Sequence, residues 1–166
     1  MPKGKNKKQK SSIIQVSIGI LAVILAILII IMMEIVSDIQ GTARIVNYTG
    51  LVRGETQRVI KLEVSMQQQN EMIHEIRSFI DGLRNGNDKL NLVRLNDIDF
   101  QNKMQELDEK FSDLYKKIYF MRFKGSENTD IISESEEFFL ICDEATGLAE
   151  KYSQKKATSL SLLEKY

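Results

Sequence analysis

The hydrophobic residues of this chain form one unbroken apolar run, followed by segments in which apolar residues recur every three or four positions. The run extends from Ser11 to Met33 and holds no charged residue over its 23 positions. A helix of that length measures roughly 34 Å at about 1.5 Å per residue, enough to cross a hydrocarbon core of about 30 Å. The run therefore predicts a transmembrane helix over residues 11–33.

The two sides of this predicted span differ in charge. Residues 1–10 contain five lysines and no acid. The chain has 23 basic and 23 acidic residues, so the part beyond those lysines has 18 basic against 23 acidic ones, a net charge of −5. Lysine beside a span resists translocation, so residues 1–10 are expected to be a cytoplasmic tail and residues 34–166 to be extracytoplasmic. Topology explains the lysines, and we expect no nucleic-acid partner.

A cleaved signal peptide is the alternative interpretation of the apolar run. Its apolar region would cover about 7–15 residues and end in small residues. Here the run is longer and ends at Met32, Met33 and Glu34. The pattern favours an uncleaved anchor in the plasma (inner) membrane.

Two stripes with steps of three and four follow the span, and they predict that the transmembrane helix continues to Met66–Gln69. The first stripe is Ile35, Ile39, Thr42, Val46, Thr49, Arg53, Thr56 and Ile60; the second is Ile45, Tyr48, Val52, Val59, Leu62 and Met66. Two stripes on one helix predict two contact faces. We expect one face to pack in the helix's own bundle and the first stripe to meet a second subunit.

Three more helices are predicted. One covers Asn70 to Arg84 and ends at Asn85-Gly86-Asn87, and residues 87–97 are expected to be a loop. The next is capped by Asp97 or Asp99 and ends at Gly125, with the apolar stripe Phe100, Met104, Leu107, Phe111, Leu114, Ile118 and Met121. The last is capped by Thr129 or Asp130 and runs toward Tyr166, with the stripe Ile131, Ser135, Phe138, Cys142, Ala145, Ala149 and Tyr152.

Four amphipathic helices with short connections predict an all-α fold, in which residues 34–166 form an antiparallel four-helix bundle. An even number of helices returns the chain to the bilayer, so a second span is expected beyond residue 166.

The sequence offers no catalytic or metal-binding pattern. It has no glycine-rich phosphate loop, no cysteine pair and no HExxH. Cys142 lies among apolar residues and is expected in the core, and His74 is expected in solvent. We expect neither an enzyme nor a cofactor in these residues.

Residues 47–58, NYTGLVRGETQR, differ from an ordinary bundle helix. Gly50 and Gly54 each cost about 0.5–1 kcal/mol relative to alanine, and their spacing of four allows another backbone to come close. Arg53 lies on the first stripe, where a charge is costly unless it is paired.

At a two-fold seam Arg53 would meet its own copy, and two guanidinium groups about 6 Å apart repel by about 2–3 kcal/mol at an effective dielectric constant near 20. A small anion between them would remove this penalty, and Thr49, Thr56 and Gln57 could supply further donors. The alternative is that Arg53 pairs with an acid of another helix, such as Glu137 or Asp143.

The segment resembles the signature of the helical-bundle sensor domains of nitrate/nitrite sensor kinases and type IV pili methyl-accepting chemotaxis proteins, a pattern close to N-x-A-G-x-x-R-M-x-S-Q-R. Asn47, Gly50, Arg53, Gln57 and Arg58 match it, and Thr56 replaces the serine. Similar regions precede bacterial membrane diguanylate cyclases and histidine kinases. The resemblance implies that Arg53 binds the anion at a dimer axis. Thr49 stands where alanine is usual and Gly54 where methionine is usual, so the resemblance does not fix the identity of the ligand.

These features predict the sensor domain of a bacterial membrane receptor, with a small anion bound at a homodimer interface and a signal carried by helix displacement. Arg53, Thr49, Thr56 and Gln57 are the expected ligand-binding residues, supported by Asn47 and Arg58. A kinase, cyclase or chemotaxis output module would follow residue 166. The alternative is a single-pass membrane-anchored helical scaffold that binds a partner and no ligand.

Overall fold

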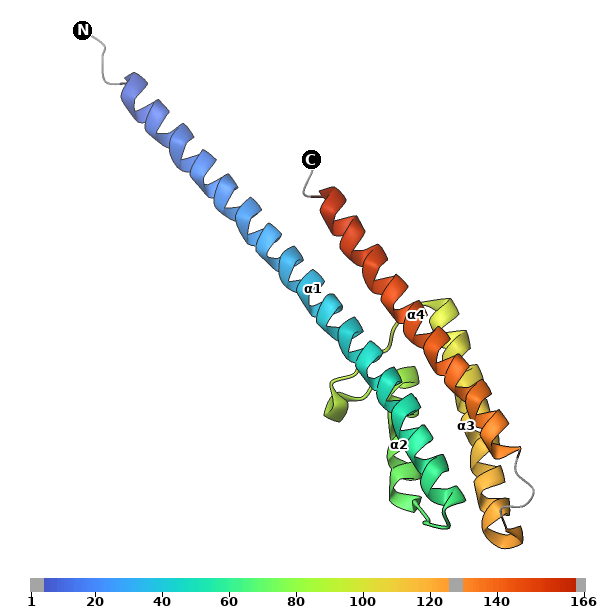
Figure 1. Ribbon diagram of the computed structural model, residues 1–166. Helices are drawn as coiled ribbons and strands as arrows, with labels where there is room; N and C mark the ends of the chain where they lie inside the picture. The colour runs from blue at the N-terminus through green and yellow to red at the C-terminus, as the bar shows by residue number, and fades with distance from the viewer. Residues whose placement is uncertain (1–4, 126–129, 164–166) are drawn as a thin grey trace. The chain divides into compact units, whose positions relative to one another are not determined.

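The computed structural model describes residues 5–125 and 130–163, with the backbone alone for residues 5–13, 38 and 159–163. The described part is helical and contains no strand, as predicted (Figure 1). Its elements are α1 (Lys5–Val64), α2 (Asn70–Asn85), the 3₁₀ turn η1 (Asp88–Leu90), α3 (Ile98–Lys124) and α4 (Ile131–Leu163). The chain divides into two compact units, residues 1–38 and residues 39–166.

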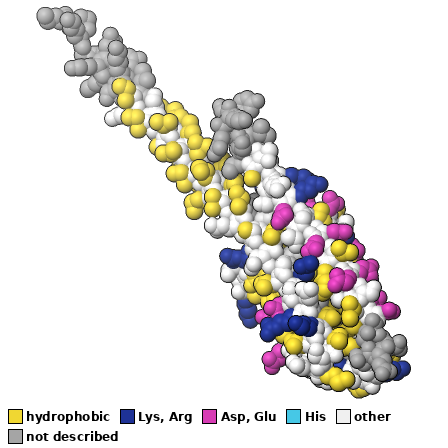
Figure 2. Space-filling model, in the orientation of Figure 1, with side chains coloured by type: hydrophobic (Ala, Val, Ile, Leu, Met, Phe, Trp, Pro, Cys, Tyr) yellow, Lys and Arg dark blue, Asp and Glu magenta, His cyan; other side chains and the backbone are white. Residues whose placement is uncertain are grey.

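The N-terminal unit contains the apolar run. α1 includes a stretch that is long and apolar enough to cross a membrane, as judged by length and composition. The large hydrophobic side chains between Ile14 and Met33 are exposed, and Figure 2 shows them along this segment. An apolar surface of this kind is stable in lipid and costly in water, which fits a membrane anchor.

The C-terminal unit is built from the second part of α1 together with α2, α3 and α4, which surround one apolar core (Figure 1). Every residue of the predicted α3 stripe, from Phe100 to Met121, is buried. The α4 stripe is also buried from Ile131 to Ala149, and Tyr152 packs against it. The rings of Phe111 on α3 and Phe138 on α4 lie 5.8 Å apart at the centre of this core. The apolar positions that recur at steps of three and four therefore correctly predict the buried faces of α3 and α4.

Residues of both stripes of α1 face this core, and the expectation that the whole first stripe meets a second subunit is wrong, because half of its members are buried within the chain. Ile45, Val52 and Val59 of the second stripe are buried. Buried members of the first stripe are Thr42, Thr49, Thr56 and Ile60. The two stripes are adjacent, and together they form one wide buried face because three helices pack against α1.

α1 ends at Val64, slightly before the predicted Met66–Gln69. Met66 takes a left-handed backbone conformation, with φ of 62°. Its N–H donates to the carbonyl of Glu63 (2.9 Å), and the N–H of Gln67 donates to the carbonyl of Leu62 (2.9 Å). This pair of bonds satisfies the last carbonyls of the helix and turns the chain toward α2.

The two ends of α3 agree with the predicted cap and stop signals. Asp97, rather than Asp99, caps α3, because its Oδ1 accepts a hydrogen bond from the N–H of Phe100 (3.0 Å). Gly125 ends α3 with φ of 83°. The predicted loop 87–97 includes η1, which is closed by backbone hydrogen bonds between Asn87 and Leu92. Thr129 and residues 164–166 lie outside the described residues.

A buried ion pair that the sequence analysis did not predict joins α1 to α3. Arg122 Nε donates to Glu63 Oε2 (2.9 Å), and a second guanidinium nitrogen donates to Oε1. The Glu63 side chain is 1% exposed. Its Oε1 also accepts from the N–H of Gln69 (2.7 Å), and Arg122 Nη1 donates to Asn70 Oδ1 (2.7 Å). The hydrogen bonds to Glu63 raise the pKa of Arg122. The network fixes the end of α1 and the turn into α2 against α3.

Replacing Glu63 by alanine is predicted to destabilise the chain by about 3–5 kcal/mol, because the largely buried Arg122 charge loses its carboxylate partner and retains the neutral Asn70 side chain. The double variant Glu63→Leu/Arg122→Met should recover much of that loss. Urea unfolding of the full chain in detergent micelles, followed by circular dichroism, measures both. The control is Asp113→Ala, which removes an exposed pair with Lys116 and should change stability little; equal losses in Glu63→Ala and the control would contradict the assignment.

The burial of the first stripe gives a second prediction, on thiol accessibility. The native Cys142 is buried and its pKa is raised to about 12 by burial, so below that pH it stays a protonated, protected thiol. In a Cys142→Ser background, a maleimide should label Ser78→Cys, which is exposed on α2, rapidly and Thr49→Cys slowly. Labelling of position 49 as fast as position 78, with intact helix content, would show that the first stripe faces outward.

Candidate ligand-binding site on the α1 surface

The residues that carry the sensor-domain signature lie on the exposed side of α1. Asn47, Gly50, Gln57 and Arg58 are exposed, and Arg53 is half-buried at the edge of this surface. Asn47, Gly50 and Gln57 recur with Ala43 and Gly54 at steps of three and four, so these five share one face of the helix, and Arg53 and Arg58 lie at its two edges. The signature therefore marks a surface, whereas the residues between its positions, such as Val52, pack in the core.

Arg53 pairs with Asp143 of α4, which is the alternative that the sequence left open. Its Nε lies 3.0 Å from Asp143 Oδ1, and the two side chains are 43% and 57% exposed. The geometry is that of an ion pair without a well-directed hydrogen bond from Nε. The guanidinium carbon also lies 5.8 Å from the centre of the Phe139 ring. An exposed pair of this kind stabilises a fold by about 0–1 kcal/mol, so Arg53 can exchange its partner at small cost.

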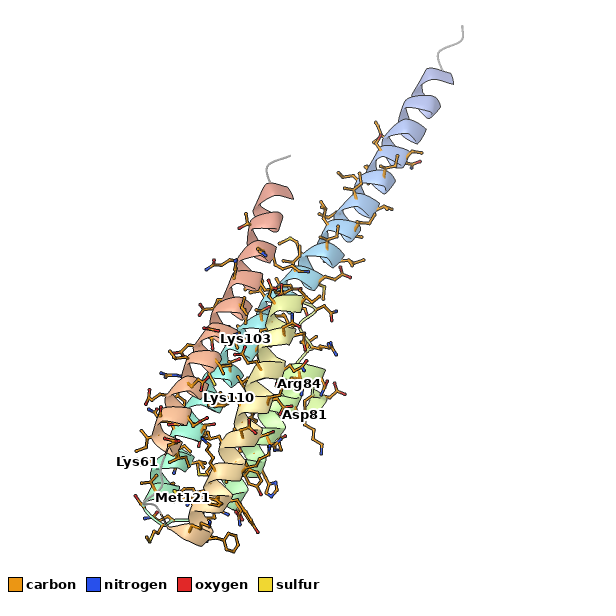
Figure 3. The ribbon with its side chains drawn as sticks, turned by 90° about the vertical axis from the view of Figure 1, so that its right-hand side faces the viewer. Lys61, Asp81, Arg84, Lys103, Lys110 and Met121 are labelled. Atoms are coloured by element: carbon orange, nitrogen blue, oxygen red, sulfur yellow. The ribbon has the colours of Figure 1, made fainter. Side chains whose placement is uncertain are left out.

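The other candidate partner, Glu137, is occupied elsewhere. Its Oε2 lies 2.6 Å from Lys110 Nζ, and this hydrogen bond raises the pKa of Lys110. On the same side of α4, Glu134 pairs with Lys117 (2.6 Å), which lowers the pKa of Glu134. These lysines belong to α3, where Figure 3 labels Lys110 and Lys103. The acids on this side of α4 thus bind α3, and Asp143 is left for Arg53.

Thr49 and Thr56 do not share the surface that holds Arg53 and Gln57. Both are buried. The hydroxyl of Thr49 donates to the carbonyl of Ile45 (2.8 Å). The hydroxyl of Thr56 has no hydrogen-bond partner among the described residues. Either side chain could reach a ligand at this surface only if the core opened.

Gly50 and Gly54 leave the backbone of α1 uncovered. A Cβ atom built at either position meets no other atom of the described chain within 4 Å. The predicted close approach of another helix is therefore not made by a helix of this chain, and both positions remain open to another molecule.

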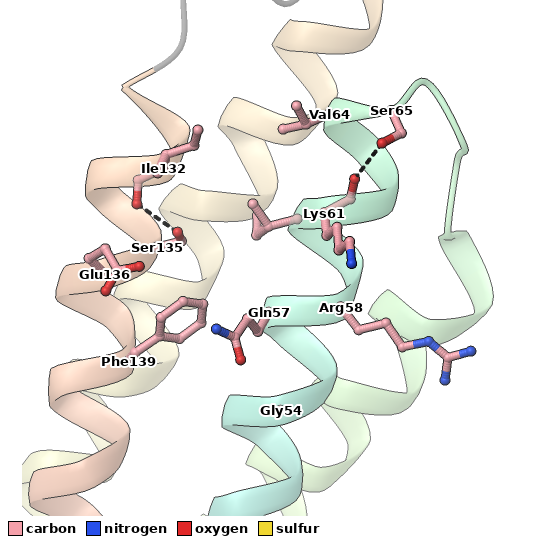
Figure 4. A pocket seen from close by; sticks show the side chains of 11 residues that line it. Gly54, Gln57, Arg58, Lys61, Val64, Ser65, Ile132, Ser135, Glu136 and Phe139 are labelled. Carbon is pink, nitrogen blue, oxygen red and sulfur yellow. Dashed lines mark hydrogen bonds between the residues drawn. The ribbon is translucent and has the colours of Figure 1, made fainter.

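A groove of about 720 Å³ lies between α1 and α4 (Figure 4). Phe139 connects the groove to Arg53, since its ring contacts the Arg53 guanidinium and also lines the groove. The α1 side is Gly54, Gln57, Arg58, Ile60, Lys61, Val64 and Ser65, and the α4 side is Ile132, Ser135, Glu136 and Phe139. In Figure 4, Gln57 extends toward Phe139, whereas Arg58 extends away from α4. The sequence analysis found Gln57 and Arg58 but missed the α4 side, because no local pattern marks residues that meet only in the fold.

Within residues 5–125 and 130–163, no three His, Cys, Asp or Glu side chains converge as a metal site. His74 is exposed on α2, as predicted.

Comparison with known proteins identifies the fold. No protein-family model and no curated protein sequence matches the chain. A solved structure does: the ligand-binding domain of the P. aeruginosa nitrate receptor McpN, with a TM-score of 0.60 over 66% of this chain and 96% of that one. The identity is 13%, so the likeness is one of fold. The resemblance to helical sensor domains that residues 47–58 predicted is thereby confirmed in fold: this chain folds like the ligand-binding domain of a chemoreceptor.

Proposed function

We propose that residues 34–166 form the extracytoplasmic four-helix-bundle sensor domain of a bacterial membrane receptor, anchored by α1, which binds a small anion. The observation that carries the proposal is the position of Arg53. In a fold like that of a receptor's ligand-binding domain, the arginine of the signature lies at the surface and is held by one weak, exposed ion pair. The structural neighbour is a nitrate receptor, so nitrate is the first anion to test.

Anion binding at Arg53 is a competition with Asp143. In the free domain the Asp143 carboxylate occupies the guanidinium. A planar or tetrahedral oxyanion can accept two parallel N–H bonds from the guanidinium fork, a stronger arrangement than the present pair. Asp143 then acts as an internal substitute for the ligand, and its release frees α4 from α1 at this level.

The proposal includes a homodimer, in which the subunits meet at a different face of α1 from the one predicted by the sequence. Because the three threonines of the first stripe are buried, we place the subunit contact on the exposed face of Ala43, Asn47, Gly50, Gly54 and Gln57. Gly50 and Gly54 allow a second α1 to come close, because nothing in this chain covers them. A two-fold axis there places two Arg53 side chains near each other, and an anion between them offsets their repulsion.

The proposed signal is a small displacement of α1 relative to α4, since the Arg53–Asp143 pair joins these two helices. A change of a few kcal/mol in the balance between two arrangements is enough to switch an output. The output module would be a kinase, a cyclase or a chemotaxis signalling rod on the cytoplasmic side.

The anion site predicts opposite effects for the two partners of the pair. In the full chain in lipid nanodiscs, Asp143→Asn should bind the responsive anion up to about fivefold more tightly, since it removes a competitor worth about 0–1 kcal/mol. Arg53→Ala should lose binding, and Arg94→Ala, another exposed arginine, should not. Thermal unfolding with nitrate, nitrite, sulfate and formate at constant ionic strength measures the effect. If no anion raises the midpoint, or Arg53→Ala responds like wild type, the ligand-free scaffold becomes the better account.

The revised subunit contact predicts which engineered cysteines form an intersubunit disulfide. In a Cys142→Ser background, Asn47→Cys should form an intersubunit disulfide in membranes, because position 47 lies on the proposed contact face. Ser78→Cys, which is exposed on α2, is the matched control and should stay monomeric on non-reducing gels. Cross-linking at 78 and not at 47 would place the subunit contact on another face.

A further inference from the structure

The groove between α1 and α4 carries two opposite charges that do not meet. Lys61 projects from α1 and Glu136 from α4, and both line the groove. Neither forms an ion pair with another described residue, although most other charged side chains along α3 and α4 are paired. Because Lys61 and Glu136 pair neither with each other nor with another described residue, one cation and one anion remain available to a bound molecule.

Apolar side chains contribute the larger part of the groove's surface. Ile60 and Phe139 are buried beneath it, and Val64 and Ile132 add further apolar surface. The Gln57 amide, which extends toward Phe139 in Figure 4, supplies a donor and an acceptor. The volume of about 720 Å³ lies within the range of about 300–1,000 Å³ that is usual for small-molecule sites.

We propose that this groove binds a short zwitterionic peptide with apolar side chains. Its carboxylate meets Lys61, its ammonium group meets Glu136, its peptide unit bonds to Gln57, and its side chains cover Ile60 and Phe139. An extended dipeptide carries its ammonium group and its carboxylate roughly 7 Å apart, at about 3.3–3.6 Å per residue. A free inorganic anion has no partner for Glu136 or for the apolar floor, so this site differs from the proposed anion site at Arg53.

The test uses the full chain in lipid nanodiscs and isothermal titration calorimetry with the dipeptide Leu-Leu. We expect saturable binding that is lost with N-acetyl-Leu-Leu-amide, which keeps the apolar side chains and lacks both charges. Lys61→Met and Glu136→Gln should each weaken binding about fivefold, the loss of one exposed ion pair. The controls Lys89→Met and Glu150→Gln change exposed residues away from the groove and should bind like wild type.

The charge reversal Lys61→Glu/Glu136→Lys separates a direct role of the charges from damage to the fold. It restores one cation and one anion on opposite walls, so Leu-Leu should bind again, in the reversed direction. The anion titration and the Leu-Leu titration are separate measurements on the wild-type chain, so failure of the anion site would not remove this one. Absence of saturable binding, equal binding of the capped peptide, or wild-type binding by both single variants would overturn the proposal.

Discussion

The burial of both stripes of α1 in one core is the constraint on which the rest of the structure depends. Because Thr49, Val52 and Thr56 face inward, the positions between them face outward, and the residues of the sensor signature follow the exposed side of the helix. The Glu63–Arg122 pair then fixes the end of α1 against α3. The α1–α4 side holds an exposed ion pair at Arg53, which can exchange partners, and the groove beside it.

The sequence predicted the elements well and the faces of α1 less well. The α3 stripe, the Asp97 cap and Gly125 could be predicted because each depends on local spacing or backbone geometry. The orientation of α1 could not, because threonine at Thr42, Thr49 and Thr56 is compatible with either a core or an interface. The choice of Asp143 rather than Glu137 as the partner of Arg53 depended on Lys110 of α3, and the Glu63–Arg122 pair joins residues 59 positions apart.

The fold and the site support the same kind of function from different directions. The fold is that of a receptor's ligand-binding domain, and the α1 surface places an arginine where a weak carboxylate contact can be replaced. In this account Asp143 has a role that the signature alone does not reveal: it shields the Arg53 charge in the free state and links ligand binding to the contact between α1 and α4. The peptide site proposed in the neighbouring groove, with its unpaired charges, would extend the same surface to a second class of ligand.

The central claim is that an anion displaces Asp143 from Arg53. The most direct measurement is the ¹⁵Nε resonance of Arg53 in the full chain, labelled with ¹⁵N-arginine in nanodiscs and assigned with Arg53→Lys, during titration with nitrate, nitrite, sulfate and formate. The account predicts a saturable shift of the Arg53 resonance with at least one of these anions, at a lower concentration in Asp143→Asn, while the Arg94 resonance stays in place. An Arg53 resonance that is unchanged by every anion, or that moves only in parallel with Arg94, would contradict it.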